Sequence, residues 1–340
     1  MRRLVFGLLV VAALVTGCAE SVDGAARPGS RDVDPASFFA GAVATYGQPV
    51  SSDDVDGLAY LRALRRIDPC GLLTHDDLVK IGEIGSVGTL FAFDECDVDV
   101  KVPGETDRRY VSVELTRTHV DGQPVVFRAA GLPVYDADPG SCDYLVPLEL
   151  SRLPGAPPAR GADRPFVRIG LIADGNCEFV QRLVQAVAPR LAALRVPLRD
   201  AVAVYPAEVA EHDPCHVLSA LDGQVGYWDV EHSRPYECDF VLQRIGFDAA
   251  PLRVSLEPQS YDMATETRTR LDRDGVEVFV DQGSCTAATF VGPALRRKFV
   301  GGSSIPTGDV VIRPAVVVAA GPGRCDAAID VAAASAKFYA

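Results

Sequence analysis

The chain has 340 residues, of which 48% are hydrophobic and 23% are charged, and its formal net charge is −13. This composition is normal for a folded globular protein and excludes a wholly disordered or collagen-like chain. The excess of acidic residues argues against a nucleic-acid-binding protein, which would present a basic face.

The first 17 residues have the pattern of a secretory signal peptide. Arg2 and Arg3 precede an apolar run over residues 4–15, and small residues stand before Cys18. The run is shorter than the roughly 20 residues that a membrane-spanning helix needs. Residues 15–18, Val-Thr-Gly-Cys, resemble the lipobox of bacterial lipoproteins, which implies a diacylglycerol on the Cys18 thiol and cleavage just before it. We therefore expect a protein held by acyl chains at the extracytoplasmic face of the cell membrane.

Two short segments follow the predicted anchor. Residues 18–37 are small, polar and rich in helix breakers, which predicts a flexible, lipidated tether. Residues 38–67 contain an amphipathic stretch at 58–67 and predict a helical extension that packs on the first repeat. Its acidic start at 52–57 imitates a calcium loop, but Ala63 stands where that loop needs a glutamate, so we interpret it as a helix start.

The other eight cysteines form two matching sets. In both sets the first cysteine follows Asp-Pro, the second lies between Glu and Asp, and the third follows Gly-Ser. The second set follows the first at offsets of 142 to 148 residues. This pattern predicts a tandem duplication, with a first repeat at 68–196, a linker at 197–212 and a second repeat at 213–340.

Each repeat predicts an α+β fold, a mainly antiparallel sheet with a short helix before it and a longer helix after it. In the first repeat we expect a helix from Thr74 to about residue 81, strands at 95–102, 110–117, 123–128, 142–150 and 166–173, and a helix at 177–194. In the second we expect a short helix from His216, strands at 237–245, 252–257, 276–281, 285–291 and 310–319, and a helix at 326–338.

An even number of cysteines in an exported protein predicts disulfides, although the sequence leaves three pairings open in each repeat. Sequential pairing is expected, because one bridge would then join the opening helix to the first strand and the other would join the strand after the Gly-Ser turn to the last helix. The expected bonds are Cys70–Cys96, Cys142–Cys177, Cys215–Cys238 and Cys285–Cys325.

These motifs resemble the actinobacterial DUF3558 lipoproteins, which are envelope proteins without an assigned activity. The resemblance rests on Asp-Pro-Cys before Leu72 and Leu73, on the cysteine at the head of a strand, and on the helix that Cys177 opens. It implies a compact α+β domain, distantly similar to the extracellular sensor domain of a mycobacterial receptor kinase. It implies no catalytic residue.

The sequence contains no catalytic motif of the serine-elbow, zinc-protease or phosphate-loop type. His212 and His216 have metal-ligand spacing, but Pro214 breaks the helix that would align them. We therefore expect no catalytic residue, no metal and no cofactor, and an envelope hydrolase is the less favoured alternative.

Acidic residues gather beside two of the cysteines. They are expected to be solvated turn and strand-end residues, with a weak cation site as the alternative. They are Asp94, Asp97 and Asp99 near Cys96, and Asp136, Asp138 and Asp143 near Cys142.

The expected function is non-catalytic ligand binding or sensing, in a cleft within a repeat or between the two. Tyr227, Trp228 and Tyr236 are the candidate pocket wall, with a core or rim position as the alternative. The second hypothesis is a module that binds an envelope protein through a surface patch or a sheet edge. An enclosed cavity would favour the first hypothesis, and a flat exposed apolar patch would favour the second.

Overall fold

The computed structural model describes residues 35–106, 108–158, 164–171, 177–199, 210, 212–243, 251–299 and 308–339. The expected signal peptide, Cys18 and most of the expected tether lie outside these residues and stay predictions. Within the described ranges, no helix combines the length and the hydrophobicity that crossing a bilayer requires.

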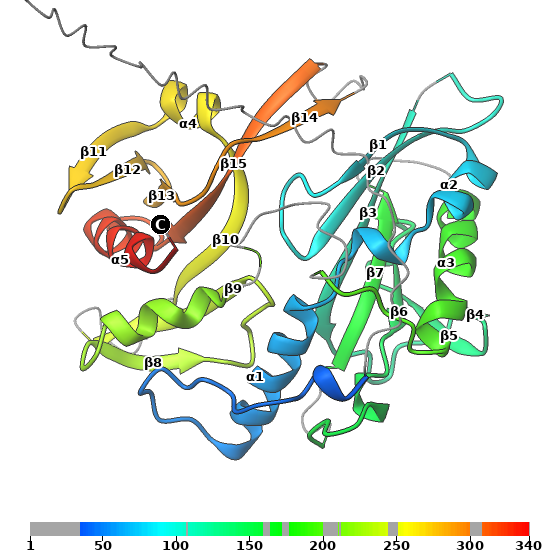
Figure 1. Cartoon of the computed structure of the whole chain (residues 1–340), viewed down its shortest axis with the longest axis horizontal. Coiled ribbons are helices and arrows are strands. Elements are labelled where there is room, and N and C mark those ends of the chain that lie inside the picture. Colours follow the sequence, from blue (N-terminus) through cyan, green and yellow to red (C-terminus); the bar gives the residue numbers. More distant parts are fainter. Residues whose placement is uncertain are drawn as a thin grey trace, which may run out of the picture.

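The first lobe, residues 68–199, is an antiparallel sheet covered on one face by two helices (Figure 1). The described strands are ordered β1-β2-β3-β7-β6-β5-β4. Valines alternate along β2 and β3 and are buried in the same core as the apolar side chains of α3. The elements are η2 (Cys70–Leu72), α2 (His75–Ile81), β1 (Glu83–Gly88), β2 (Glu95–Lys101), β3 (Arg108–Thr118), β4 (Phe127–Ala129), β5 (Leu132–Asp136), β6 (Tyr144–Pro147), η3 (Leu150–Arg152), β7 (Arg164–Leu171) and α3 (Cys177–Ala192).

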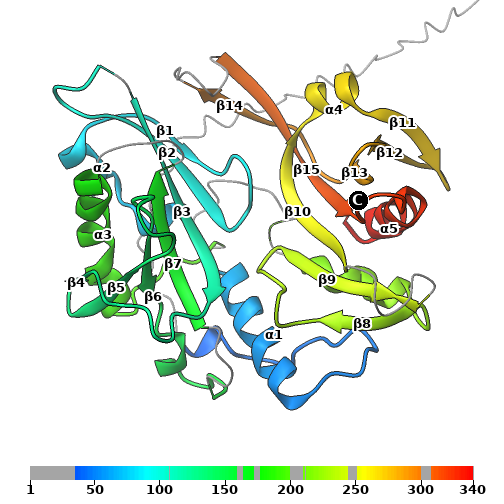
Figure 2. The same cartoon turned by 180° about the vertical axis from the view of Figure 1, so that it is seen from behind.

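The second lobe, residues 210–339, repeats this arrangement. Its described strands are ordered β8-β9-β10-β15-β13-β12-β11, and β14 pairs with β15 as an addition. Helix α5 packs on β12, β13 and β15, as α3 packs on the first sheet (Figure 2). The elements are η5 (Pro214–Ala220), β8 (Val225–Asp229), β9 (Glu237–Leu242), β10 (Leu252–Ser260), α4 (Tyr261–Thr267), β11 (Thr269–Arg273), β12 (Val276–Asp281), β13 (Thr286–Phe290), β14 (Leu295–Phe299), β15 (Gly308–Ala319) and α5 (Cys325–Tyr339).

The two strand orders correspond one for one, so the predicted α+β fold in two tandem units is confirmed. Small backbone features are duplicated too. Cys142 and Cys285 both have a left-handed backbone, with φ of 55° and 51°. Asp68 and Asp213 each accept the backbone N–H of the following cysteine, Cys70 or Cys215, at 3.0 Å.

The disulfides are confirmed as well. The described residues form four, two in each lobe, in the expected sequential pairing: Cys70–Cys96, Cys142–Cys177, Cys215–Cys238 and Cys285–Cys325. In each lobe one bond joins the opening 3-10 turn to the second strand of the sheet, and the other fixes the start of the long helix. Loop closure of this length contributes roughly 3–4 kcal/mol per bond in the chain-entropy model.

Other elements differ from expectation. The helix expected from His216 is the 3-10 helix η5, whose first residue is Pro214. Strands β1, β5, β8, β11 and β14 and helix α4 have no counterpart among the expected elements. The physical reason is clearest for β11, which is exposed along its whole length and therefore has no alternating apolar pattern.

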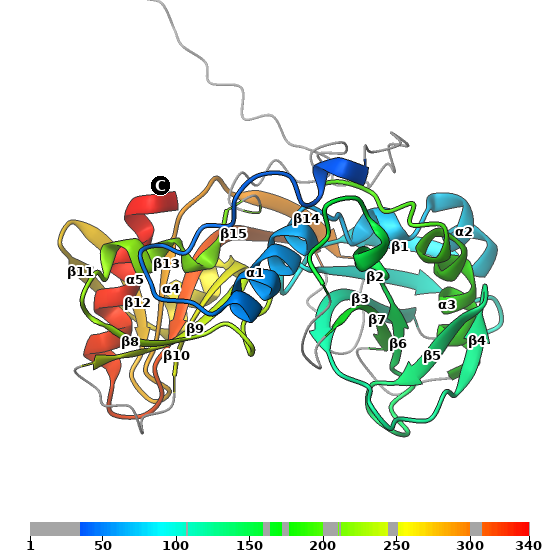
Figure 3. The ribbon, with the colours of Figure 1, turned by 90° about the horizontal axis from the view of Figure 1, so that it is seen from below.

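Helix α1 (Ser52–Arg65) packs on both lobes, not on the first alone (Figures 1 and 3). Ser51 and Asp54 form a capping box that starts the helix at the acidic segment. Leu58 and Leu61 belong to the core of the second lobe, whereas Ala63 and Leu64 belong to the core of the first. Leu61 and Leu64 are three residues apart and therefore adjacent on the helix surface, so they lie where the two buried faces of the helix meet. The helix is therefore shared between the two cores.

We predict that truncating α1 on its two faces destabilises different lobes. Leu61→Ala and Leu64→Ala each remove a side chain that is at most 1% exposed, and each should lower the free energy of unfolding by about 2–5 kcal/mol. Hydrogen exchange should accelerate mainly in the second sheet for Leu61→Ala and in the first sheet for Leu64→Ala. The exposed Ser52→Ala is the control. Equal acceleration in both sheets for both variants would contradict a divided helix.

Candidate ligand-binding cavity between the two lobes

The segment before α1 is a strap, residues 35–51, that crosses from the first lobe to the second (Figure 3). At its start Phe38 is buried in the first core, and further on Tyr46 packs against the second core. Two arginines hold the strap in place, Arg62 of α1 and Arg66, the residue that follows this helix. Arg62 donates to the carbonyls of Ala42 and Gly41 at 2.7 and 3.1 Å, and Arg66 donates to the Ser37 carbonyl.

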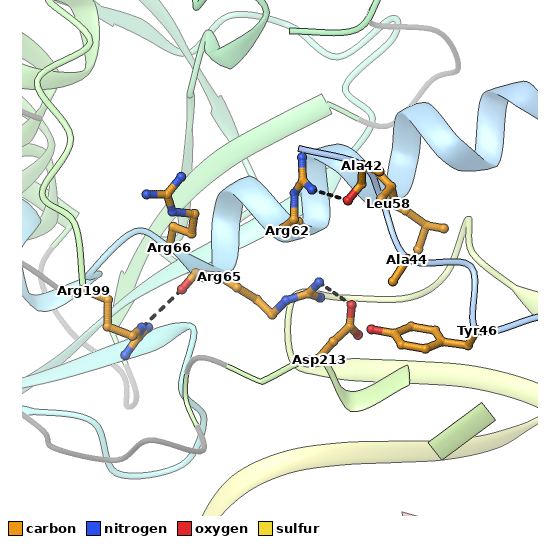
Figure 4. Close-up of a pocket in the computed structure, with 10 residues that line it drawn as sticks. Ala42, Ala44, Tyr46, Leu58, Arg62, Arg65, Arg66, Arg199 and Asp213 are labelled. Atoms are coloured by element: carbon orange, nitrogen blue, oxygen red, sulfur yellow. Dashed lines mark hydrogen bonds and ion pairs between the residues drawn. The ribbon is translucent and has the colours of Figure 1, made fainter. Parts of the chain in front are cut away.

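A cavity of about 400 Å³ lies between the strap, α1 and the start of the second lobe. Four of the residues that line it are arginines, and one is an aspartate. The lining comprises Ala42, Val43, Ala44, Tyr46, Leu58, Arg62, Arg65, Arg66, Arg199 and Asp213 (Figure 4). Strap, shared helix and both lobes thus meet at one cavity.

Arg65 connects the helix to the second lobe across this cavity. It is 7% exposed, and it donates to the Asp213 carboxylate and, at 3.0 Å, to the Pro235 carbonyl. Tyr46 lies beside the same carboxylate, and burial together with the negative charge of Asp213 raises the pKa of its phenol. The phenol is therefore neutral at physiological pH.

Arg199 makes the complementary connection from the first lobe. Its guanidinium donates to the carbonyls of Arg65, Ile67 and Phe93, the last at 2.6 Å, and lies over the ring of Tyr236. Phe93 and Pro235 both stand three residues before the second cysteine of their lobe. The two arginines thus bind equivalent carbonyls of opposite lobes.

The three aromatic residues expected to form a pocket wall are not brought together as one. Tyr227 and Trp228 point to opposite sides of β8, since Tyr227 is 54% exposed while Trp228 is buried in the second core. Tyr236 is buried under α1, and its hydroxyl donates to the carbonyls of Arg65 and Ala210. None of the three lines the cavity, although Trp228 contacts Tyr46, which does.

The sequence alone does not identify the arginines of the cavity. Arg62 and Arg66 are four residues apart, and Arg65 is three from Arg62, so all three lie near one side of the helix and its end. Arg199 falls in the expected linker, at 14 residues before Asp213, and nothing in the sequence connects it to the helix.

The expectation that the acidic residues near the cysteines are solvated is wrong for four of them. Asp94, Asp97, Asp99 and Asp143 are 2–7% exposed. They belong to, or lie next to, strands whose side chains alternate between the apolar core and the opposite face of the sheet. On that face Arg108 pairs with Asp99 and Arg168 pairs with Asp143. Asp136 and Asp138 are only partly buried or exposed.

Two carboxylates near the sheet face opposite the core have raised pKa values. Burial raises the pKa of Glu114, and the cations Arg168 and Arg234 moderate the effect. Arg234 reaches Glu114 from the other lobe at 3.6 Å. Burial raises the pKa of Asp94 well above its ordinary value, and neighbouring Glu114 adds to the rise. In the described part of the chain, no three metal-binding side chains are arranged to hold a cation.

His212 and His216 pack against aromatic rings of α5. The His216 ring centroid lies 4.4 Å from that of Phe338, and His212 lies 5.5 Å from Tyr339. Both imidazoles therefore take part in side-chain packing at the end of α5.

Comparison of the chain with protein-family models, with curated proteins and with solved structures finds no match. The resemblance to DUF3558 lipoproteins accordingly stays a prediction, and the function has to be argued from the cavity and its surroundings.

Glu257 on β10 provides a prediction about pH. Burial raises the pKa of its carboxyl to about 7, with a further contribution from Glu237, against an ordinary value of 4.5. Between these pH values the folded protein keeps a proton that the unfolded chain has lost, so the free energy of unfolding falls as pH rises through this window. Glu257→Gln stays neutral, and we expect it to be more stable than the parent protein at pH 8, by on the order of 2 kcal/mol, but not at pH 4.

Urea unfolding at both pH values checks this expectation. The exposed Glu266→Gln on α4 removes the same charge and should show no such difference between pH 4 and pH 8. An equal gain for Glu257→Gln at both pH values would show that packing, and not protonation, is responsible.

Proposed function

We propose that this protein is a lipid-anchored, extracytoplasmic protein of the cell envelope that binds a small ligand in the cavity between its lobes and acts in sensing rather than catalysis. The observation that carries the proposal is the cavity itself. At about 400 Å³ it falls within the size range of small-molecule sites. It also lies where such sites are common, at the junction of two domains.

The groups in the cavity support binding. Among the described residues that line it, the polar side-chain groups are four guanidiniums, the Asp213 carboxylate and the Tyr46 phenol. Guanidiniums stay charged at physiological pH and orient anions or acceptors, whereas proton transfer needs a group whose pKa lies near the working pH. The Asp213 carboxylate already accepts hydrogen bonds from Arg65 and from the backbone N–H of Cys215.

The position of the strap supports sensing. Ala42, Ala44 and Tyr46 of the strap contribute to the cavity lining, and the strap is the part of the described chain that follows the predicted tether. A ligand in the cavity would touch both lobes, the shared helix and the segment next to the membrane anchor. Occupancy would therefore change how firmly these parts are connected, which a partner in the envelope could detect.

The alternative, a module that binds an envelope protein, has less support. Large apolar side chains that are exposed come from separate elements of both lobes, and scattered exposure of this kind is normal for a protein surface. They are Val79, Phe91, Val125, Val126, Tyr227, Met263 and Leu271.

Blocking the cavity should abolish ligand binding. We predict that a protein-free small-molecule extract of the cell envelope raises the melting temperature of the parent protein but not of Ala44→Trp, whose indole would fill the cavity. Ala40→Trp adds the same side chain to an exposed strap position outside the lining and should respond like the parent. Equal stabilisation of Ala44→Trp would place the ligand elsewhere, and no stabilisation of the parent would contradict a ligand-binding function.

The anchor can be tested separately. We predict that Cys18→Ala, which lacks the acylated thiol, leaves the membrane fraction when cells are fractionated, since the lipid would be the main membrane attachment. Ser21→Ala, three residues further along, should stay with the membrane. A Cys18→Ala protein that remains membrane-bound would exclude a lipid anchor at this cysteine.

A further inference from the structure

The charges that line the cavity are unbalanced. Four arginines face one aspartate among the described residues of the lining, although the chain as a whole is strongly acidic. Three of the four belong to the end of α1 and the residue after it, and Arg199 approaches from the end of the first lobe. Positive charge is thus concentrated at one place in an acidic protein.

The contacts of these arginines leave that charge only partly compensated. Arg62, Arg66 and Arg199 donate to carbonyl or hydroxyl oxygens of the described residues, which are neutral. Among the described residues, Arg65 pairs with the Asp213 carboxylate, and the buried Asp68 carboxylate lies near Arg199. Arg62 and Arg66 are therefore the two whose charge is compensated least. Neutral acceptors fix the guanidiniums in place without cancelling their charge, which is the arrangement of a preorganised anion site.

The electrostatic result is visible at Arg62. Burial lowers the pKa of its guanidinium, and the nearby charges of Arg65 and Arg66 lower it further. The guanidinium is still charged at physiological pH. An anion placed among these three side chains would relieve their mutual repulsion, and a neutral ligand would not.

The arginines are spread along the cavity and do not surround a single point (Figure 4). Arg66 and Arg199 lie toward one end, while Arg62 and Arg65 lie nearer to Tyr46 and Asp213 at the other. A single small anion could approach part of this set. A molecule with anionic groups at two positions could approach the arginines at both ends.

We infer that the ligand of the cavity is a small organic polyanion that carries carboxylate or phosphate groups. This inference rests on the proposed function and gives its ligand a chemical class. Guanidinium binds both planar carboxylate and tetrahedral phosphate oxygens through paired N–H donors, so the shared feature is the set of anionic oxygens.

The test introduces a negative charge into the cavity without changing any arginine. Ala44 lines the cavity and its own side chain is exposed, so Ala44→Glu and Ala44→Gln put side chains of nearly equal size at the same position and differ in charge. Citrate and inorganic pyrophosphate serve as probes of the two anion types. Binding is measured by calorimetry and by thermal shift, with sodium chloride added to keep the ionic strength constant.

We expect at least one probe to bind the parent protein, with Ala44→Gln within a few-fold of it and Ala44→Glu weaker by about tenfold or more. Arg195→Gln removes an exposed arginine outside the lining and should bind like the parent. Equal binding by Ala44→Glu and Ala44→Gln would place the anion outside the cavity and overturn the inference.

Failure of the inference and failure of the proposed function give different results. If neither probe binds and the envelope extract stabilises the parent but not Ala44→Trp, the cavity binds a ligand that is not a polyanion of this kind, and only the inference falls. If neither the probes nor the extract stabilise the parent, the arginines serve to fix the strap and the lobes, and both proposals fall.

Discussion

The structure depends on one helix that belongs to two hydrophobic cores. Because Leu58 and Leu61 are buried in the second lobe while Leu64 is buried in the first, neither lobe can complete its core without α1. Phe93 strengthens this connection, since a residue of the first lobe is buried in the second core against Tyr236. The lobes are thereby joined by apolar burial, and the hydrogen bonds of Arg65 and Arg199 lie beside it. The cavity exists where this shared helix, the strap and the second lobe fail to fill space completely.

Duplication explains why the contacts at the junction occur in related pairs, and divergence explains where they differ. Asp68 and Asp213 cap equivalent turns, but Asp213 also accepts Arg65 and lines the cavity, whereas Asp68 lies buried near Arg199. The strand registers make Glu114 and Arg168 of the first sheet equivalent to Ser255 and Val317 of the second. The ion pair between Glu114 and Arg168 in the first sheet thus corresponds to two neutral side chains at the same positions of the second sheet. The two copies keep one architecture and place charge differently on it.

Cysteine spacing and strand alternation predict most of this fold from the sequence, because both reflect local chemistry. The disulfide pairing and the cores of β2, β3, α3 and α5 follow from residues whose neighbours along the chain carry the signal. The cavity could not be predicted in this way. Arg199 meets Arg65 through a contact that spans 134 residues, and the capping box predicts the start of α1 but not that its two faces enter different cores. Neighbouring aromatic residues such as Tyr227 and Trp228 suggest a pocket wall by residue type alone. Because side chains alternate along a β-strand, only Trp228 is buried and Tyr227 points to solvent.

The acidic character of the chain and the basic character of the cavity act over different distances. At physiological ionic strength, charges on the surface are screened beyond about 8 Å, so the net charge of −13 acts weakly on an anion that is still approaching. Inside the cavity the nearest charges decide, because partly buried pairs are screened much less. Carboxylates over the rest of the surface disfavour anions that come into contact with them. An anion is therefore stabilised at few places other than the cavity. A ligand bound there would owe its affinity to arginines held by backbone carbonyls at the junction of the two lobes, and any change in that junction would alter its binding.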